Sequence, residues 1–260
     1  MALYQIMKKI IKLFREISGV RRVLRTADFF RWLALLLRCF FKVLRTGSLG
    51  PVDEAYGSRV EFRSGSSWLV IDNGSLGVVR EIIASHCYIH PEELADACNI
   101  LDLGANCGVF TLFALSSAAN ARVVSVEAQP QMANVARANI TANGFHTRVL
   151  LHNAYAGEPN VFIDGLRKTH PQLSRFDPDE YIRQVGCCDF LKCDIEGAEY
   201  SLITERSFWL KKVRRMSLEY HGTWEDGAKL KRVVEGHGFA VRQTPHGNLG
   251  YLMCSRVNNE

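Results

Sequence analysis

The sequence predicts an α/β protein built around a doubly wound, mostly parallel sheet. Apolar strand-like runs alternate with helix-like stretches from residue 99 onward, and acidic residues stand at or near the ends of several of these runs. Such alternation is typical of a parallel sheet with helices on both faces, right-handed crossovers and ligands at the carboxyl ends of the strands. The predicted parallel strands cover residues 99–104, 121–127, 147–153, 188–194 and 213–220.

Length and composition predict one full domain with an appendage. The chain has 260 residues, of which 47% are hydrophobic and 23% charged, enough to bury a sizeable core. We divide it into a basic amphipathic helical segment at 1–50, a small β-rich lead-in at 51–95 and the main domain at 96–260. The eight cysteines are scattered without a Cys-x-x-Cys pair, which indicates a reduced, cytoplasmic compartment.

Residues 1–45 predict two basic amphipathic helices. This segment holds eleven basic residues against Glu16 and Asp28, a net +9, whereas the whole chain carries +5. The remainder is therefore acidic, which disfavours nucleic-acid binding by the main domain. The uncharged runs at 1–7 and 32–37 are far shorter than the ~20 residues of a membrane span. Three interpretations stay open: peripheral contact with an anionic membrane at its inner face, a lid over an apolar substrate, or packing on the body or a partner subunit.

The next segment predicts a linker and a hairpin. Gly47-Ser48-Leu49-Gly50-Pro51 has the composition of a linker. Residues 56–83 alternate and turn in a strand-like way, which favours a small β-layer before the core.

Residues 99–108, Asn-Ile-Leu-Asp-Leu-Gly-Ala-Asn-Cys-Gly, are typical of the start of a nucleotide-type cofactor site. An apolar strand ends in a tight loop, and a helix is expected from about Cys107. Gly104 and Gly108 allow the sharp turn and the close approach of a ligand to the backbone. Asp102, at the carboxyl end of the strand, can accept hydrogen bonds or balance a cation.

The loop departs from the dinucleotide pattern. That pattern places glycines at its first, third and sixth positions, but the third position here is Asn106 and the sixth is Val109. Asp102 would also repel a diphosphate. These features favour S-adenosylmethionine, which carries a sulfonium and an ammonium group and no phosphate.

A second strand supplies the ribose partner. Residues 121–127 end in Glu127, about twenty residues past the loop, where nucleotide-binding sheets place the carboxylate that binds the ribose hydroxyls. Pro130 then opens a helical stretch that Gly144 ends. The predicted cofactor-binding residues are Asp102, Gly104, Asn106, Gly108, Glu127 and, at the end of the third strand, Asn153.

The rest of the chain completes the sheet. Residues 155–185 are interpreted as an irregular insertion that faces the substrate. Residues 239–244 and 248–255, joined by 245–248, predict an antiparallel closing hairpin.

Two neighbouring strands end in reactive side chains. Lys192 and Asp194 are two residues apart, as are Glu219 and His221, so each pair projects from one face of its strand. Both pairs therefore lie at the same end of the predicted sheet as Asp102 and Glu127.

These motifs together resemble the FkbM-type methyltransferases. The resemblance covers roughly residues 95–255 and rests on Asp-x-Gly-Ala-Asn-x-Gly at 102–108, Val-Glu at 126–127, Lys-x-Asp-x-Glu-Gly-Ala-Glu at 192–199 and Glu-Tyr-His at 219–221. Ala-Gln at 128–129 departs from the acid-proline continuation common in the family. The resemblance implies a class I (Rossmann-like) methyltransferase fold that uses S-adenosylmethionine, in a family with members that methylate hydroxyls of sugars or polyketides.

Methylation of a hydroxyl needs a base within hydrogen-bond reach. We expect His221 to be that base, Asp194 to orient it or to act as the alternative base, and Lys192 to stabilise the developing alkoxide. A structural histidine and a Lys192–Asp194 pair are the competing interpretations. Metal dependence stays open and no metal ligand is assigned, because Asp194, Glu196 and Glu199 suit either a divalent ion or the start of a helix.

The expected function is O-methylation of a sugar hydroxyl, in a glycan, glycolipid or lipo-oligosaccharide, or of a polyketide hydroxyl. A degenerate methyltransferase fold that acts as a membrane-associated scaffold is the alternative from the binding class. An NAD-dependent oxidoreductase is disfavoured by Asn106 and Val109. The sequence leaves the acceptor and the oligomeric state undetermined.

Overall fold

The computed structural model describes residues 2–246 and 249–257, and the side chains of 2–6, 8–10 and 12 fall outside that description. The chain divides into two compact units, Met1–Cys87 and Tyr88–Glu260. Two parts of the sequence predictions lie outside the described residues: the middle of the 245–248 turn and the side chains of Lys8, Lys9 and Lys12.

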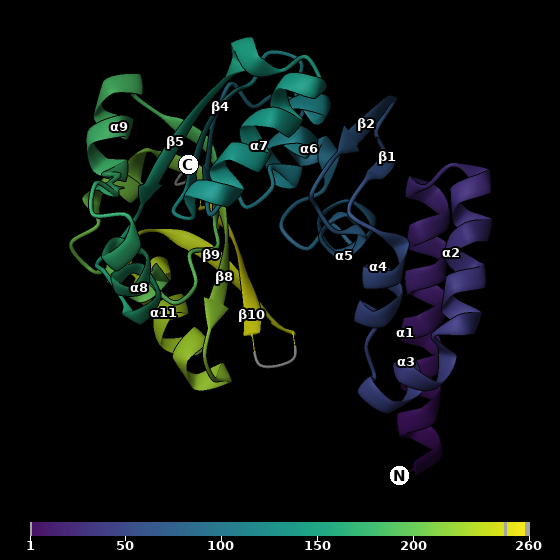
Figure 1. The fold of residues 1–260 in the computed structure, drawn as a ribbon. Coiled ribbons are helices and arrows are strands. Elements are labelled where there is room, and N and C mark those ends of the chain that lie inside the picture. Colours follow the sequence, from purple (N-terminus) through teal and green to yellow (C-terminus); the bar gives the residue numbers. More distant parts are fainter. Residues whose placement is uncertain (1, 247–248, 258–260) are drawn as a thin grey trace. The chain divides into compact units, whose positions relative to one another are not determined.

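The first unit combines helices with a small hairpin. It contains α1 (Ala2–Val23), α2 (Thr26–Arg38), α3 (Phe40–Thr46), α4 (Gly50–Tyr56), β1 (Val60–Ser64), β2 (Ser67–Ile71) and α5 (Leu76–Val79). The first expected amphipathic helix is α1, and α1 lies beside α2 (Figure 1). The second was expected to be one helix, but it is divided at Cys39 into α2 and α3. The expected linker is shorter than predicted because Gly50-Pro51 begins α4, and proline suits the first helical turn, where its missing N–H is not needed.

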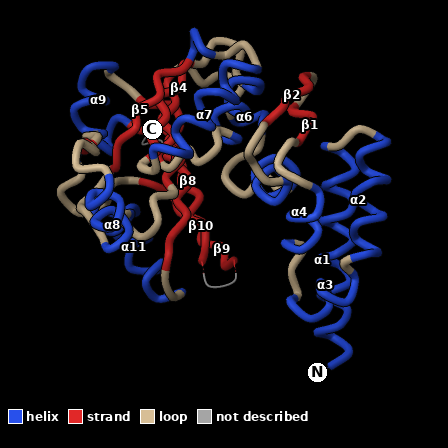
Figure 2. The backbone as a smooth tube through the Cα atoms, in the orientation of Figure 1, coloured by secondary structure: helices blue, strands red, loops and turns tan. Residues whose placement is uncertain are grey.

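The second unit is a doubly wound α/β domain, as predicted. Its sheet has the strand order β6-β5-β4-β3-β7-β8-β10-β9, and β10 is antiparallel to both of its neighbours. Figure 2 shows the strands in red between helices on both sides. The strands are β3 (Asn99–Leu103), β4 (Arg122–Glu127), β5 (Val149–Tyr155), β6 (Ser174–Arg175), β7 (Cys188–Cys193), β8 (Val213–His221), β9 (Phe239–His246) and β10 (Leu249–Arg256).

Helices cover both faces of this sheet. Helices α6 (Val109–Ser117) and α7 (Pro130–Ala142) pack on one face, and α8 (Val161–Thr169), α9 (Pro178–Val185) and α11 (Trp224–Gly236) lie on the other (Figure 1). The short α10 (Glu199–Leu202) follows β7. Residues 155–185, expected to be irregular, thus contain two helices and a short strand. Asn160 and Asp177 cap these helices by accepting backbone N–H bonds, a signal that the proline content of the segment concealed.

The register of the central strands positions the site. Strand β3 lies between β4 and β7, and Asp102 is directly opposite both Ser125 and Lys192. Because parallel strands point the same way, the carboxyl ends of β3, β4, β7 and β8 meet at one edge of the sheet.

Candidate active site

The loop after β3 requires glycine at residue 104. Gly104 has a φ of +81°, and a Cβ added there would lie 1.7 Å from the carbonyl oxygen of Asp194. Asn106 and Gly108 also have positive φ angles, of 50° and 89°, so the loop turns through three left-handed residues before α6 begins at Val109. The helix therefore starts two residues later than expected.

Glu127 ties this loop to the end of β4. One carboxylate oxygen accepts the backbone N–H of Asn106 at 2.8 Å, and the other accepts that of Gln129 at 2.8 Å. The side chain is buried, and this burial raises the pKa of Glu127 while both backbone hydrogen bonds oppose the rise. Each carboxylate oxygen retains acceptor capacity for a ligand hydroxyl.

A hollow opens at the carboxyl ends of β3, β4 and β7. Its volume is about 60 Å³. Its lining combines three carboxylates with apolar side chains and includes Gly104, Asn106, Glu127, Ala154, Phe162, Ile163, Asp194 and Glu196. A larger cavity of about 600 Å³ lies at the amino ends of β4 and β5, beside α9, away from the residues that the sequence motifs single out.

Three of the predicted cofactor residues do not line the hollow. Asp102 is fully buried and accepts a hydrogen bond from Thr111 at 2.7 Å. Asn153 donates from its amide to the backbone oxygens of Glu127 and Ala128, at 2.9 and 3.1 Å. Gly108 packs against α7. These residues support the walls of the hollow from outside.

Lys192 is a buried ammonium group beneath the loop. Its Nζ donates to the carbonyl oxygens of Leu103 and Gly104 and lies 3.5 Å from Asp102 and 3.7 Å from Asp194. Burial lowers the pKa of Lys192, but the neighbouring carboxylates more than offset that effect and raise it above its ordinary value. Lys192 is therefore cationic at neutral pH and holds the loop through its backbone.

Tyr88 links two carboxyl groups: that of Asp194, which follows β7, and that of Glu219, which lies near the end of β8. Its hydroxyl lies 2.9 Å from a carboxylate oxygen of Asp194 and 2.9 Å from one of Glu219. Its ring also lies 5.3 Å from the Lys192 ammonium, within the range of a cation–π contact. The sequence reasoning missed Tyr88, because it stands alone in a loop and only the tertiary fold brings it to Asp194.

His221 is held between two glutamates. Its Nδ1 lies 3.3 Å from a carboxylate oxygen of Glu199, and its Nε2 lies 3.4 Å from one of Glu196. Glu199 is fully buried and also accepts the backbone N–H of Ile195. This carboxylate raises the pKa of His221 to about 9, so the imidazole carries a proton at neutral pH.

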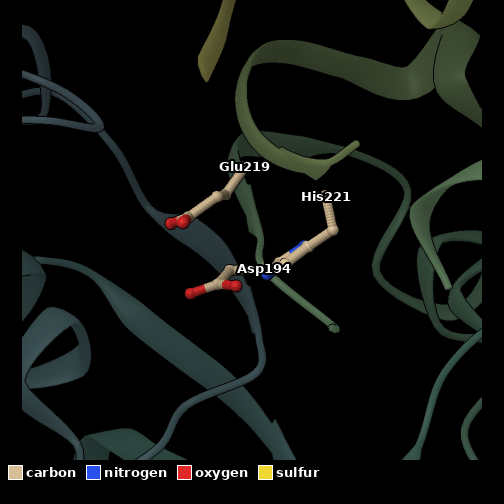
Figure 3. A group of neighbouring side chains, drawn as sticks. All are labelled: Asp194, Glu219 and His221. Atoms are coloured by element: carbon tan, nitrogen blue, oxygen red, sulfur yellow. The ribbon is translucent and has the colours of Figure 1, made fainter. Parts of the chain in front are cut away.

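Asp194, Glu219 and His221 form one group at the sheet edge (Figure 3). Ligand atoms of these three residues lie within 4.8 Å of one another, a spacing open to a divalent cation. The sequence assigned no metal ligand and left Asp194, Glu196 and Glu199 open between a divalent ion and the start of a helix. Glu219 belongs to the group because the two-residue period of β8 places it on the same face as His221.

A family model described as the methyltransferase FkbM domain matches residues 102–241, which is more than half of the chain. That match and the sheet order together confirm the predicted class I methyltransferase fold. The search of curated proteins gives no match.

Several solved methyltransferases are similar to this chain at low identity. Precorrin-6y C5,15-methyltransferase of Geobacter metallireducens GS-15 is 16% identical, with a TM-score of 0.44 over 64% of this chain and 82% of that one. An O-methyltransferase family protein of Burkholderia thailandensis is 15% identical, with a TM-score of 0.42 over 65% and 53%. The fibrillarin pre-rRNA processing protein of Methanococcus jannaschii is 13% identical, with a TM-score of 0.46 over 65% and 69%. These likenesses assign no acceptor to this chain.

Proposed function

This chain belongs to the family of FkbM methyltransferase domains, and we propose that it transfers a methyl group from S-adenosylmethionine to a hydroxyl of a sugar or polyketide. The observation that supports the proposal is that a hollow and a group of titratable side chains lie next to each other at the carboxyl ends of the strands. The hollow beside Glu127 adjoins the group formed by Asp194, Glu219 and His221. One feature suits the methyl donor, and the other suits a hydroxyl that must lose a proton.

The residues of the hollow suit this cofactor. Its cationic part would be balanced by Asp194 and Glu196, its ribose hydroxyls would bind Glu127, and its adenine would lie on the apolar side chains of the lining, which include Phe162 and Ile163. When bound, the cofactor supplies an electrophilic methyl group. Because the hollow measures about 60 Å³ and a ligand site for a molecule of this size measures roughly 300 Å³ or more, the lining of the hollow must open when the cofactor binds.

Asp194 is the proposed proton acceptor. It lies at the rim of the hollow and its side chain is 26% exposed, so an acceptor hydroxyl can reach it. His221, which the sequence favoured as base, already carries a proton at neutral pH because of Glu199. Its role in this proposal is therefore electrostatic: the imidazolium stabilises negative charge on the acceptor oxygen as the proton leaves. Lys192 keeps the loop and Asp194 in position.

The test has a binding arm and a transfer arm. Equilibrium binding of S-adenosylmethionine should be lost in Glu127→Ala and retained in Glu225→Ala, since Glu225 is an exposed glutamate at the start of α11. Labelled cofactor with an extract fractionated into lipid-linked and soluble acceptors should then give label on a hydroxyl. Absence of cofactor binding by the unaltered protein would favour the scaffold alternative, and binding of a nicotinamide cofactor would favour the oxidoreductase.

A further inference from the structure

The first unit exposes large apolar side chains on the outer faces of its helices. On α1, Met7, Ile11 and Phe14 are 51%, 48% and 69% exposed. Their spacing of four and three residues places them on one helical face. The opposite face of α1 is packed, because Val20 and Val23 are buried and Gly19 contacts Ala84.

The same pattern recurs on α2 and α3. Phe30 and Leu37 are 62% and 76% exposed and share the face of α2 opposite the buried Phe29 and Trp32. In α3 three more apolar side chains are exposed: Phe40, Phe41 and Leu44. The packed side of these helices already buries Trp32 completely, so these outward apolar groups are not needed to hold the unit together. We call the eight exposed apolar residues of α1, α2 and α3 the apolar face.

Exposed basic residues lie on the same helices as the apolar face: Arg15, Arg38, Lys42 and Arg45. Arg22, Arg25 and Arg31 are also exposed, but they bind Ala84, Glu61 and Tyr56 within the unit. Glu16 and Asp28 are the only acidic residues of this segment, and Glu16 is engaged by Arg80 inside the unit. Apolar and basic side chains that are exposed on the same helices are complementary to anionic headgroups above a hydrocarbon layer.

We propose that the apolar face of the first unit docks onto an anionic lipid surface. The helices lie in the plane of the interface, with the phenylalanine and leucine side chains below the headgroups and the arginines on the lipid phosphates. Among the helices that the structure describes, none is long and apolar enough to cross a bilayer. This proposal concerns the first unit alone and does not depend on the activity of the second.

The test is cosedimentation of the full chain with vesicles. Vesicles of phosphatidylcholine alone are compared with vesicles in which phosphatidylglycerol replaces part of that lipid. The chain should bind the anionic vesicles, and binding should weaken as salt rises, because ions screen the arginines. Binding that is equal for both lipids at all salt concentrations would overturn the proposal.

A matched pair of variants locates the contact. Leu37→Ser with Phe41→Ser removes two members of the apolar face and should weaken binding by at least about tenfold. Val161→Ser with Phe208→Ser changes two equally exposed apolar residues of the second unit, at 91% and 63% exposure, and should leave binding unchanged. Circular dichroism checks that both variants fold. Equal losses in both would refute the assignment to the first unit.

Two further measurements complete the test: vesicle binding by a variant with fewer charges, and the oligomeric state of the chain without lipid. Arg38→Gln with Arg45→Gln should weaken binding to anionic vesicles and flatten its salt dependence, whereas lysine at both positions should preserve binding. If the unaltered chain is a dimer without lipid and Leu37→Ser with Phe41→Ser makes it monomeric, a second copy covers the apolar face and the membrane proposal is wrong.

Discussion

Replacing Gly104 by alanine tests whether the close approach of two loops builds the site. A Cβ at residue 104 would lie 1.7 Å from the carbonyl oxygen of Asp194, and ordinary contacts begin at 3.4 Å. One of the two backbones must therefore move by about 1.7 Å. Such a movement would break the hydrogen bond from the Asp194 N–H to the Leu103 oxygen, which measures 3.0 Å. It would also displace Asp194 from the hollow.

The expected cost of this substitution has two parts. The left-handed φ costs alanine roughly 1–2 kcal/mol, and the lost hydrogen bond adds roughly 1 kcal/mol. Gly144→Ala measures the cost of the left-handed φ alone. The φ of Gly144 is +76°, but nothing lies within 4 Å of an added Cβ. Gly104→Ala should therefore lower the free energy of unfolding by more than Gly144→Ala does, by at least about 1 kcal/mol.

Chemical denaturation of both variants measures this difference, and calorimetric titration measures cofactor binding. Gly104→Ala should lose binding of S-adenosylmethionine, while Gly144→Ala should keep it. Equal destabilisation by both substitutions, with cofactor binding intact in both, would refute the reasoning that the contact between residues 104 and 194 shapes the site.

Three further predictions concern charged groups. Glu199→Gln should lower the pKa of His221 from about 9 toward its ordinary value, as read by NMR titration of the imidazole; an unchanged pKa would show that Glu199 does not raise it. Since the folded pKa is raised, the stabilisation by this pair is fully present below pH ~6.5 and should be lost as pH rises through about 9, which unfolding measurements across that range check. Lys192→Met should lower the free energy of unfolding by roughly 3–5 kcal/mol, because Asp102 then lies buried without its cation, and adding Asp102→Asn should recover part of the loss in denaturation experiments. Tyr88→Phe should shift the pH profile of methyl transfer, since the carboxyl groups of Asp194, the proposed base, and of Glu219 both lose a partner; an unaltered profile would show that the Tyr88 hydroxyl does not act on the proposed base.

The strand-turn-helix pattern made the central part of the fold predictable. The residue types at 99–108 predict a strand, a tight glycine-containing loop and the start of a helix. The structure has strand β3, three residues with positive φ and then helix α6. The segment at 155–185 was less predictable. One of its prolines, Pro178, begins α9, where it favours a helix, but a proline-rich composition by itself is typical of a loop.

The sequence predicted part of the membership of the candidate site. The two-residue period of a strand identified Lys192 with Asp194 and Glu219 with His221 as same-face pairs. It did not indicate that Lys192 is buried beneath the loop, nor that Glu199 lies beside the imidazole. Burial and charge neighbours depend on which strands become adjacent, and that depends on tertiary packing.

The sequence by itself therefore determined the order of strands and helices, the loop that needs glycine, and the acidic residues at the strand ends, because these depend on backbone conformation and side-chain period. Only the tertiary structure decided which of these acids are neighbours. It brought Tyr88 to Asp194 and Glu219, and placed Glu199 where it raises the pKa of His221 to about 9. The protonation state of a side chain depends on its burial and on its distance from other charges. For residues far apart in the chain, both are set only when the sheet assembles.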